Sequence, residues 1–497
     1  MDLYGELIGR VLFPAWEGAI RRRPTFSLLR YVEQTQWRSL AELQALQIGA
    51  LRRLLRHAEA HVPYYAALLR DAGVEPSALR SVDDLQKIPI LGREQAQGSE
   101  QSRRSTSPPY ADIIKRTSGT SGKPLTFGYD WGSEHWRQAI KLRGYAWARW
   151  RVGVKTLHYW GIHPSPRPPT FAQRTKIRID RALKREQYVS CGARSDDDMN
   201  GVVEILRRER PTVMIGYSQA LADLARHVVD HGLRSWPDIA VICAAEKVFP
   251  GDRAHMERAF GPSVFETYGS REVMLIASEC EAHDGMHVSM ENLIVEVVVR
   301  EDGRTRAARP GEVGEVLITD LHNYGMPFIR YANGDLAVAG KPERCACGRN
   351  LLKISGLEGR VSDTLRDAKG GRVAGMMFAV FMAHVGHAVR QFQAVQHPSG
   401  ALTFRYVPGP QFNDDVQAYL QTSIEGSLKG FPVQMERVDD IPVSPSGKRR
   451  VVIVEPVGTP LSRAPPAVAT AQRAARPTRG PSGGDARTRS VYLSGSR

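Results

Sequence analysis

Between residues 110 and 355, short strand-like runs alternate with helical ones, and this alternation constrains the fold more than any other feature of the chain. The apolar run 213–216 leads into a helix-like segment at 218–232. The run 238–245 leads into a second such segment at 250–261. Alternation of this kind is typical of βαβ units, in which a helix crosses between parallel strands. The sequence therefore predicts an α/β fold.

The regions before and after these units have other periodicities. Residues 1 to about 105 repeat apolar residues at three- and four-residue spacing, which predicts a helical start. The runs 293–299 and 314–320 are rich in β-branched residues and have a Glu-Asp-Gly turn signal between them. They predict a pair of antiparallel strands.

The pattern changes again near Gly359, where we place a domain boundary. Residues 1–355 form the first predicted domain, and residues 356–457 have the pattern of a smaller α+β domain. From residue 458 to 497 the composition is Pro, Ala, Arg, Gly and Ser, with seven arginines and one aspartate. Too few large apolar residues remain there to form a core, so a disordered basic tail is expected.

The formal net charge of +15 makes acidic partners worth testing: nucleotides, nucleic acid, anionic membranes or coenzyme A. The longest apolar run, 373–383, has 11 residues, whereas a helix needs about 20 to cross a bilayer. The first ten residues contain two acids where a signal peptide needs basic residues. We therefore expect no transmembrane segment and a cytoplasmic location.

A loop that could bind phosphate follows the first strand-like run. It combines hydroxyls, glycines and one lysine: Thr117, Ser118, Gly119, Thr120, Ser121, Gly122 and Lys123. Glycines allow the backbone to approach phosphate oxygens, and hydroxyl and N–H groups donate to them. A P-loop is excluded by spacing, because Pro124 stands where its magnesium-binding Ser or Thr is required. A plain Ser/Gly surface turn is the alternative.

Two later segments carry groups that suit a nucleotide. In the first, Tyr268 can stack on a base and Glu272 can hold magnesium. In the second, Asp335 follows Gly334 in a tight turn, and its carboxylate can take both ribose hydroxyls. Taken alone, each segment is more typical of an ordinary turn at a strand end or of a solvated turn.

Two more segments complete an ordered series: Gly359-Arg360 at the domain boundary and Pro445-Ser446-Gly447-Lys448 near its end. A Ser/Thr/Gly loop ending in Lys-Pro, then Tyr-Gly-x-x-Glu, Arg-Tyr-x-x-Gly-Asp, Gly-Arg and Pro-Ser-Gly-Lys resembles the acyl-adenylate-forming superfamily. Within it, HVPYYAALLRDAG, DDLQKIPIL and RTSGTSGKP are most similar to the phenylacetate–CoA ligase family, nearest to its capsular-polysaccharide-associated branch. The resemblance covers residues 1 to about 457.

The resemblance implies a large N-terminal α/β domain and a small mobile C-terminal α+β lid. It implies an AMP-forming acid–thiol ligase of the acyl-CoA synthetase type, which converts a small carboxylic acid to acyl-AMP and passes the acyl group to CoA. ATP, Mg²⁺ and CoA are the cofactors and partners expected. No specific nucleic-acid partner is implied, and a homodimer is an open expectation.

The same resemblance assigns roles to individual residues. The loop from Thr117 to Lys123 should close over the β- and γ-phosphates, and Glu272 should coordinate magnesium. Lys448 corresponds to the catalytic lysine of adenylation. The residues beside the adenine and ribose are Ala245, Glu246, Tyr268, Gly269, Asp335 and Arg360. Two departures from the family pattern are Ala244, where a glycine is usual, and the hinge pair Ser362–Asp363, where relatives often have two acids.

Cysteine and histidine residues form a possible metal site. Cys345 and Cys347 make a short knuckle, and Cys280, His283 and His287 form a second group. Three thiols and one imidazole would make a closed, structural zinc site with no position for water. We predict zinc ligands at Cys280, Cys345, Cys347 and His287, with His283 as the alternative histidine. Buried free thiols are the competing interpretation.

The sequence leaves the acid and the acyl acceptor open. Pocket candidates are Tyr159, Trp160, Tyr217, Ser218 and the turn at Ala244–Ala245. Besides CoA, the acceptor could be an amine or hydroxyl, as in polysaccharide or cofactor biosynthesis. A non-catalytic nucleotide-binding scaffold is the third hypothesis.

Overall fold

The fold is described from a computed structural model of the chain. The structure describes residues 2–117, 125–160, 170–191, 195–301, 304–360, 388–428, 430–442 and 450–455, with short stretches between 365 and 385. No helix in these ranges combines the length and the apolar character needed to cross a bilayer.

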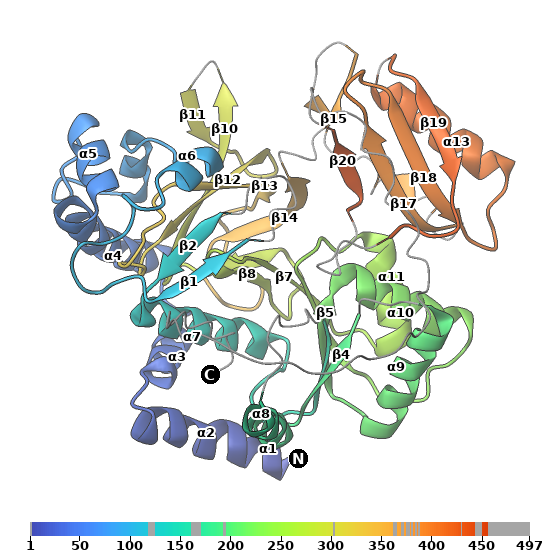
Figure 1. The fold of residues 1–497 in the computed structure, drawn as a ribbon, viewed down its shortest axis with the longest axis horizontal. Coiled ribbons are helices and arrows are strands. Elements are labelled where there is room, and N and C mark those ends of the chain that lie inside the picture. Colours follow the sequence, from blue (N-terminus) through green and yellow to red (C-terminus); the bar gives the residue numbers. More distant parts are fainter. Residues whose placement is uncertain are drawn as a thin grey trace, which may run out of the picture. The chain divides into compact units, whose positions relative to one another are not determined.

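Within the described residues, twelve strands form one sheet in the order β11-β10-β12-β13-β14-β9-β8-β7-β6-β5-β3-β4 (Figure 1). One half is parallel, as the alternating pattern predicts. Its strands are β3 (Thr156–Trp160), β4 (Glu186–Ser190), β5 (Val213–Tyr217), β6 (Ala240–Ala244) and β7 (Val264–Ser270). The covering helices are α9 (Asp196–Glu209), α10 (Ser218–Asp230) and α11 (Pro250–Phe260). Their apolar faces share one buried cluster with the strands, which accounts for the apolar strand sequences.

The other half of the sheet is antiparallel. Its strands are β8 (Met274–Glu279), β9 (Met286–Val288), β10 (Leu293–Glu301), β11 (Arg304–Ala307), β12 (Val313–Asp320), β13 (Tyr331–Ala339) and β14 (Lys353–Arg360). The predicted antiparallel pair is confirmed, because Leu293 of β10 pairs with Asp320 of β12 and the register continues to Val298 and Glu315. Outside this sheet, β1 (Ile113–Arg116) and β2 (Thr126–Tyr129) form a two-stranded hairpin.

The start of the chain is helical, as predicted. The first twenty residues form α1 (Leu3–Leu7), η1 (Ile8–Leu12), α2 (Phe13–Ala15) and η2 (Trp16–Ile20). They are followed by α3 (Thr25–Thr35), α4 (Leu40–His61), α5 (Pro63–Asp71), η3 (Val82–Lys87) and α6 (Arg93–Gly98). Ser39 and Glu42 form a capping box at the start of α4. The buried face of α4 packs into a cluster with α5, Ile294 and Ile329, and α3 packs against α7 (Trp131–Trp147).

A separate four-stranded sheet follows, in the order β19-β18-β17-β20. Its elements are β17 (Val389–Gln396), β18 (Leu402–Pro408), α13 (Asp414–Leu428), β19 (Val433–Arg437) and β20 (Val452–Val454), preceded by the short pair β15 (Leu365–Arg366) and β16 (Arg372–Val373). The sheet has its own apolar cluster around Phe404, Leu420 and Ile424.

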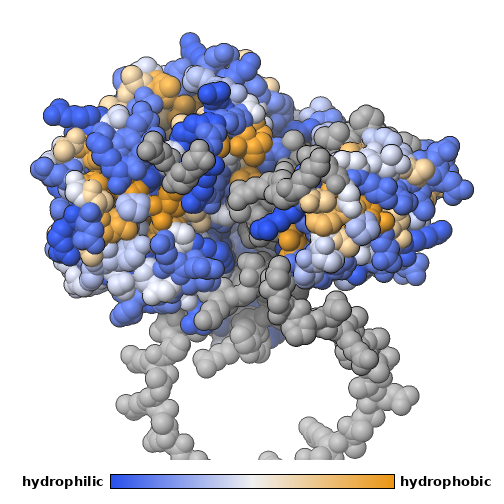
Figure 2. Space-filling model, turned by 90° about the horizontal axis from the view of Figure 1, so that it is seen from above, coloured by the Kyte–Doolittle hydropathy of each residue, from blue (hydrophilic) through white to orange (hydrophobic). Residues whose placement is uncertain are grey.

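The large sheet extends beyond the predicted boundary at 355, because β14 stays paired with β13 up to Arg360. On the face drawn in Figure 2, apolar residues lie among hydrophilic ones.

Two ion pairs lie in the interior beside the large sheet. Arg137 Nη2 is 2.6 Å from Asp320 Oδ2, and Arg143 Nη1 is 2.6 Å from Glu291 Oε1. All four side chains are at most 2% exposed. Breaking such a pair leaves one buried charge without its partner, which is strongly destabilising. The Arg137–Asp320 pair therefore ties α7 to the end of β12. The Arg143–Glu291 pair ties α7 to the turn just before β10.

A histidine next to these pairs should make stability depend on pH. His322 stacks on Trp136 with ring centroids 3.9 Å apart, and its Nε2 lies 3.0 Å from the carbonyl oxygen of Glu291. Burial lowers the pKa of His322 from 6.5 to about 4; the bond to Glu291 opposes this effect, and the charge of Arg53 adds to it. The folded protein therefore resists a proton that the unfolded chain takes up readily.

We expect the free energy of unfolding to fall as the pH is lowered from about 6.5 towards about 4, with His322 contributing up to about 3 kcal/mol. This contribution is fully present above the unfolded-state pKa. Denaturant titrations near both ends of this range, on the wild type and on His322→Gln, measure it. The same pH dependence in both proteins would show that His322 is not responsible.

Candidate active site and metal centre

The carboxyl ends of the parallel strands gather several predicted site residues. Trp160 ends β3 and Tyr217 ends β5, and their rings lie 4.5 Å apart between centroids. Tyr217 is the register partner of Ala244, the last residue of β6. Burial raises the pKa of Tyr217 to about 12, so its hydroxyl stays protonated. Open α/β sheets bind ligands outside this edge, and the acid-pocket candidates therefore lie where a ligand is expected.

The predicted adenine turn, Ala244–Ala245–Glu246, also holds the start of α10. The Ser218 hydroxyl donates to the backbone oxygen of Glu246 at 2.7 Å, and the Gln219 N–H donates to its carboxylate at 3.2 Å. A carboxylate at a helix N-terminus satisfies an N–H group that has no intrahelical acceptor. Ala245 adopts a left-handed conformation with φ of 68°, which costs energy for a residue with a Cβ. Glu246 therefore stabilises the turn and helix on which the proposed adenine site would rest.

Tyr268 and Asp335 meet although 67 residues separate them. The Tyr268 hydroxyl donates to Asp335 Oδ2 at 2.8 Å. Asn333 Nδ2 donates to both Tyr268 Oη and Asp335 Oδ2 at 2.7 Å, and Asn333 Oδ1 accepts from the Asp335 N–H. Asn333 was not assigned a role from the sequence, although it stands two residues before Asp335, where an Asn often binds the backbone of a tight turn.

Close packing explains the predicted Gly269. The β7–β8 pairing shifts register between Tyr268 and Gly269, and a Cβ on Gly269 would lie 2.3 Å from the carbonyl oxygen of Met274. No side chain fits at that distance, so the strand can turn here only with glycine. The bulge separates Tyr268 from the Glu272 turn, which carries the predicted magnesium ligand.

Arg93 joins two of the predicted site residues. Its Nη1 lies 3.6 Å from Glu272 Oε1, and its Nη2 donates to the Thr117 hydroxyl at 3.0 Å. The Tyr331 hydroxyl also contacts Glu272 Oε1, at 3.4 Å, and Arg137 donates to the Glu272 backbone oxygen. Sequence reasoning missed Arg93, because it lies at the start of α6 and outside every recognised motif. A cation beside a phosphate-loop residue and a carboxylate suits a site for a polyphosphate.

Part of the predicted site lies outside the described residues, namely Ser118, Gly119, Thr120, Ser121, Gly122, Lys123, Ser362, Asp363 and Lys448. The ends of the phosphate loop are described. Thr117 and Leu125 bond each other at 3.0 Å, through the Thr117 N–H to the Leu125 oxygen and the Leu125 N–H to the Thr117 hydroxyl. Arg360 is the register partner of Asp335 between β14 and β13, so the backbones of the two predicted ribose ligands are adjacent.

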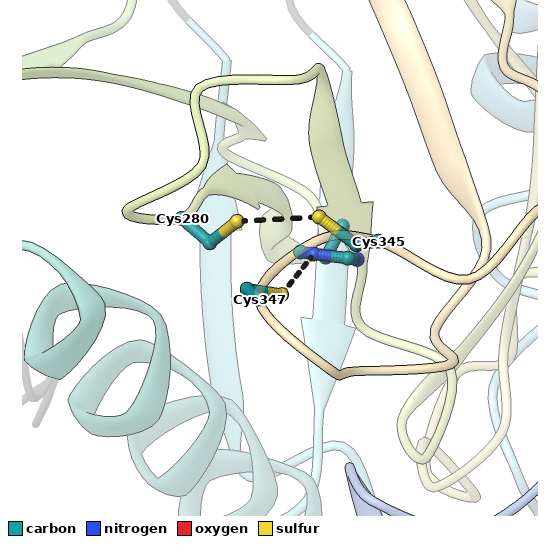
Figure 3. A group of neighbouring side chains, drawn as sticks. Cys280, Cys345 and Cys347 are labelled. Atoms are coloured by element: carbon teal, nitrogen blue, oxygen red, sulfur yellow. Dashed lines mark hydrogen bonds between the residues drawn. The ribbon is translucent and has the colours of Figure 1, made fainter.

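Cys280, Cys345 and Cys347, labelled in Figure 3, point towards one another and form one group with His287. Their ligand atoms all lie within 4.8 Å of one another. The Cys280 and Cys345 sulfurs are 3.8 Å apart, and the Cys347 sulfur is 3.3 Å from His287 Nε2. A tetrahedron with zinc–sulfur bonds of about 2.3 Å has sulfur–sulfur edges of about 3.8 Å. The donor set and its spacing therefore fit the predicted zinc.

The surroundings of His287 suit a metal ligand. Its Nδ1 lies 3.2 Å from the carbonyl oxygen of Leu351, which leaves Nε2 directed at the sulfur atoms. Burial lowers its pKa to about 4, so the ring is neutral near pH 7, as a ligand must be. The alternative, His283, lies 3.0 Å from a carboxylate oxygen of Glu279 and is not part of the group. His287 is therefore the histidine that the geometry favours.

Comparison with known proteins identifies similar enzymes. No family model matches the chain. The phenylacetate–coenzyme A ligase of Thermus thermophilus is 25% identical over 366 residues, which cover 73% of this chain and 80% of that protein. The phenylacetate–coenzyme A ligase of Escherichia coli is 27% identical over 342 residues, which cover 66% of this chain and 73% of that protein.

A solved structure confirms the fold class. The 2-hydroxyisobutyryl-CoA ligase, in the postadenylation state with 2-HIB-AMP, matches with a TM-score of 0.64 at 18% identity, over 84% of this chain and 90% of that one. The chain thus has the fold of adenylate-forming ligases, with a large N-terminal domain and a small C-terminal one. The predicted similarity to phenylacetate–CoA ligases is also confirmed.

Proposed function

We propose that this protein is an AMP-forming acid–thiol ligase, which uses ATP to convert a carboxylic acid to acyl-AMP and then transfers the acyl group to CoA. The observation that carries the proposal is the meeting of Tyr268, Asn333 and Asp335 in a chain similar to CoA ligases over about two thirds of its length. A hydroxyl, an amide and a carboxylate in mutual contact suit the recognition of a nucleoside.

The proposed first half-reaction makes a mixed anhydride. A carboxylate oxygen of the acid attacks the α-phosphorus of ATP, and pyrophosphate leaves with the electron pair of the broken P–O bond. Negative charge grows on the phosphoryl oxygens, and Lys448 and Arg93 are the cations proposed to stabilise it. Magnesium bound at Glu272 would offset the charge of the triphosphate.

The proposed second half-reaction uses the CoA thiol. The thiol gives up its proton to solvent, its sulfur attacks the acyl carbonyl carbon, and AMP leaves with the electron pair of the broken C–O bond. Residues 356–457 are proposed to act as a lid that presents Lys448 in the first step and a different face in the second. The separate sheet β17–β20 supports a domain of its own. Trp160 and Tyr217 are proposed to line the acid pocket.

Acid-dependent exchange of pyrophosphate into ATP, across a library of aromatic, aliphatic and amino acids, tests the first half-reaction without assuming an acceptor. We expect exchange with at least one acid and a thioester when CoA is added. Products on an amine or hydroxyl, identified by mass spectrometry, would favour the alternative ligase. ATP binding without exchange for any acid would favour the scaffold.

The finer assignments belong to the same proposal. We place the chain nearest to the capsular-polysaccharide-associated branch of the phenylacetate–CoA ligases, and an amine or hydroxyl of a polysaccharide is the alternative acyl acceptor that this placement favours. A structural zinc, a homodimer and a cytoplasmic location complete the proposal. Metal analysis, light scattering and cell fractionation test them separately.

Glu272→Gln should raise the magnesium concentration needed for half-maximal exchange by about tenfold, because a neutral amide is a weaker ligand for a hard cation. The side chain keeps its size, and its Oε1 can still accept from Tyr331. Magnesium titrations of the exchange rate measure the effect, with the exposed Glu94→Gln on α6 as the matched control. An unchanged magnesium requirement would mean that Glu272 only supports Arg93.

A further inference from the structure

In the N-terminal helical segment, Gly5 and Gly9 face inward, whereas seven of the large apolar side chains face outward. A Cβ on Gly9 would lie 2.4 Å from the carbonyl oxygen of Val152, and one on Gly5 would lie 3.3 Å from that of Gly153. The two glycines therefore let the segment lie directly against the backbone at Val152 and Gly153. The large apolar side chains on the outside are Leu3, Tyr4, Leu7, Val11, Leu12, Trp16 and Ile20.

Helix α8 (Phe171–Lys184) is equally unusual, because none of its 14 residues is buried. Phe171 is 85% exposed, and Ile177, Ile179 and Leu183 are exposed as well. At 100° per residue, Phe171, Thr175, Ile179 and Leu183 follow one face. The charged residues are Arg174, Lys176, Arg178, Arg181, Lys184 and Asp180, which is a net charge of +4.

The two segments form one continuous surface. The Tyr4 hydroxyl donates to the Leu183 carbonyl oxygen at 2.8 Å. Arg185, just after α8, pairs with Asp2 at 2.6 Å, and Lys184 lies 5.0 Å from the centre of the Phe13 ring. Figure 1 shows α8 beside α1 and α2 at the lower edge. We call this surface, made of residues 3–20 and 171–184, the basic apolar face.

We propose that the basic apolar face docks onto an anionic membrane surface. Exposed leucine, isoleucine and phenylalanine enter the acyl boundary of a bilayer, tryptophan and tyrosine suit its interface, and arginine and lysine meet anionic headgroups. Contiguous apolar side chains with basic residues around them are the composition that such helices require. This proposal is independent of the chemistry proposed above.

The positive charge and the apolar side chains of the basic apolar face together favour a membrane over two other partners, a second copy of the chain and nucleic acid. In a contact between two copies, two positively charged faces would approach each other, which is unfavourable. Nucleic acid would meet the same cations, but its phosphates would leave seven large apolar side chains of residues 3–20 in water. An anionic bilayer satisfies both the charge and the apolar side chains.

Flotation of the full chain with vesicles tests the proposal. We expect it to float with vesicles that contain phosphatidylglycerol, much less with phosphatidylcholine alone, and less at high salt, which screens the attraction. Leu7→Asp combined with Ile179→Asp, and separately Arg174→Glu combined with Arg178→Glu, should each weaken binding by about tenfold or more. The matched controls are Val313→Asp and the pair Arg70→Glu and Arg208→Glu, all exposed elsewhere.

Every other outcome overturns the proposal. One is the absence of flotation by the wild type, and another is equal binding by variants and controls when thermal unfolding shows that all are folded. A third is the loss of all binding in a chain ending at Val457, because the basic tail would then be responsible. A fourth is a wild-type dimer that Leu7→Asp with Ile179→Asp converts to monomer, because the face would then join two copies.

Discussion

Lys448→Ala is expected to slow acyl-adenylate formation by 10²–10³-fold while leaving the affinity for ATP nearly unchanged. The lysine charge is needed only when negative charge grows on the α-phosphate, and removing one preorganised contact of this kind costs about 3–4 kcal/mol of transition-state stabilisation. We propose that the lid is still open when ATP binds, so Lys448 does not yet contact the nucleotide and the variant loses little affinity for ATP. Pyrophosphate exchange measures the rate, and equilibrium nucleotide binding measures the affinity.

An internal control separates this effect from damage to the protein. Thioester formation from pre-made acyl-adenylate should survive in Lys448→Ala, because the lid is proposed to present another face in that step. Lys87→Ala, which removes an exposed lysine paired with Asp84, should leave both half-reactions unchanged. If pyrophosphate exchange by Lys448→Ala equals that of the wild type, the lysine is a surface charge and the proposed mechanism fails at its centre.

Loss of the metal cluster should have the largest effect on stability. We expect about one zinc per purified chain. Cys345→Ser should lower the zinc content, and it should lower the free energy of unfolding by more than about 4 kcal/mol. The cluster joins the end of β8, strand β9 and the loop between β13 and β14, so its loss frees three segments at once. A strong chelator should reproduce the effect in the wild type.

The matched control uses a buried thiol outside the cluster. Cys243 lies in β6 and contacts Met256, so Cys243→Ala should leave the zinc content unchanged even if packing suffers. Elemental analysis and denaturant titration provide the two readouts. A wild-type protein without metal, or a Cys345→Ser variant as stable as the wild type, would mean that the three cysteines are free thiols that hold no metal.

Local patterns in the sequence were enough to predict the fold class. Periodicity depends on residues close together in the chain, and it correctly placed the helical start, the parallel strands and the antiparallel pair. The domain boundary was less well defined, because β14 runs through it and its last residues pair with β13. Pairing between strands is a property of the sheet, and no local pattern reveals where it stops.

The candidate site needed the tertiary structure in three places. Tyr268 and Asp335 could be named from their motifs, but the bonds through Asn333 depend on how β7 and β13 are folded together. Arg93 belongs to no motif and reaches Glu272 and Thr117 only because α6 packs near β13. The sequence favoured His287 over His283 as the fourth metal ligand, but only the fold shows that His287 meets all three cysteines.

By itself, the sequence determined which chemical groups this protein owns and the order in which they occur, since both are properties of the covalent chain. The tertiary structure decided which of these groups meet. Pairing between Lys353 of β14 and His287 of β9 places His287 beside Cys345 and Cys347, whereas His283 lies beside Glu279. It also decided that Gly5 and Gly9 face inward, while seven large apolar side chains of residues 3–20 face outward. Periodicity predicts that a helix has an apolar face, but only the packing of the rest of the chain selects what covers that face.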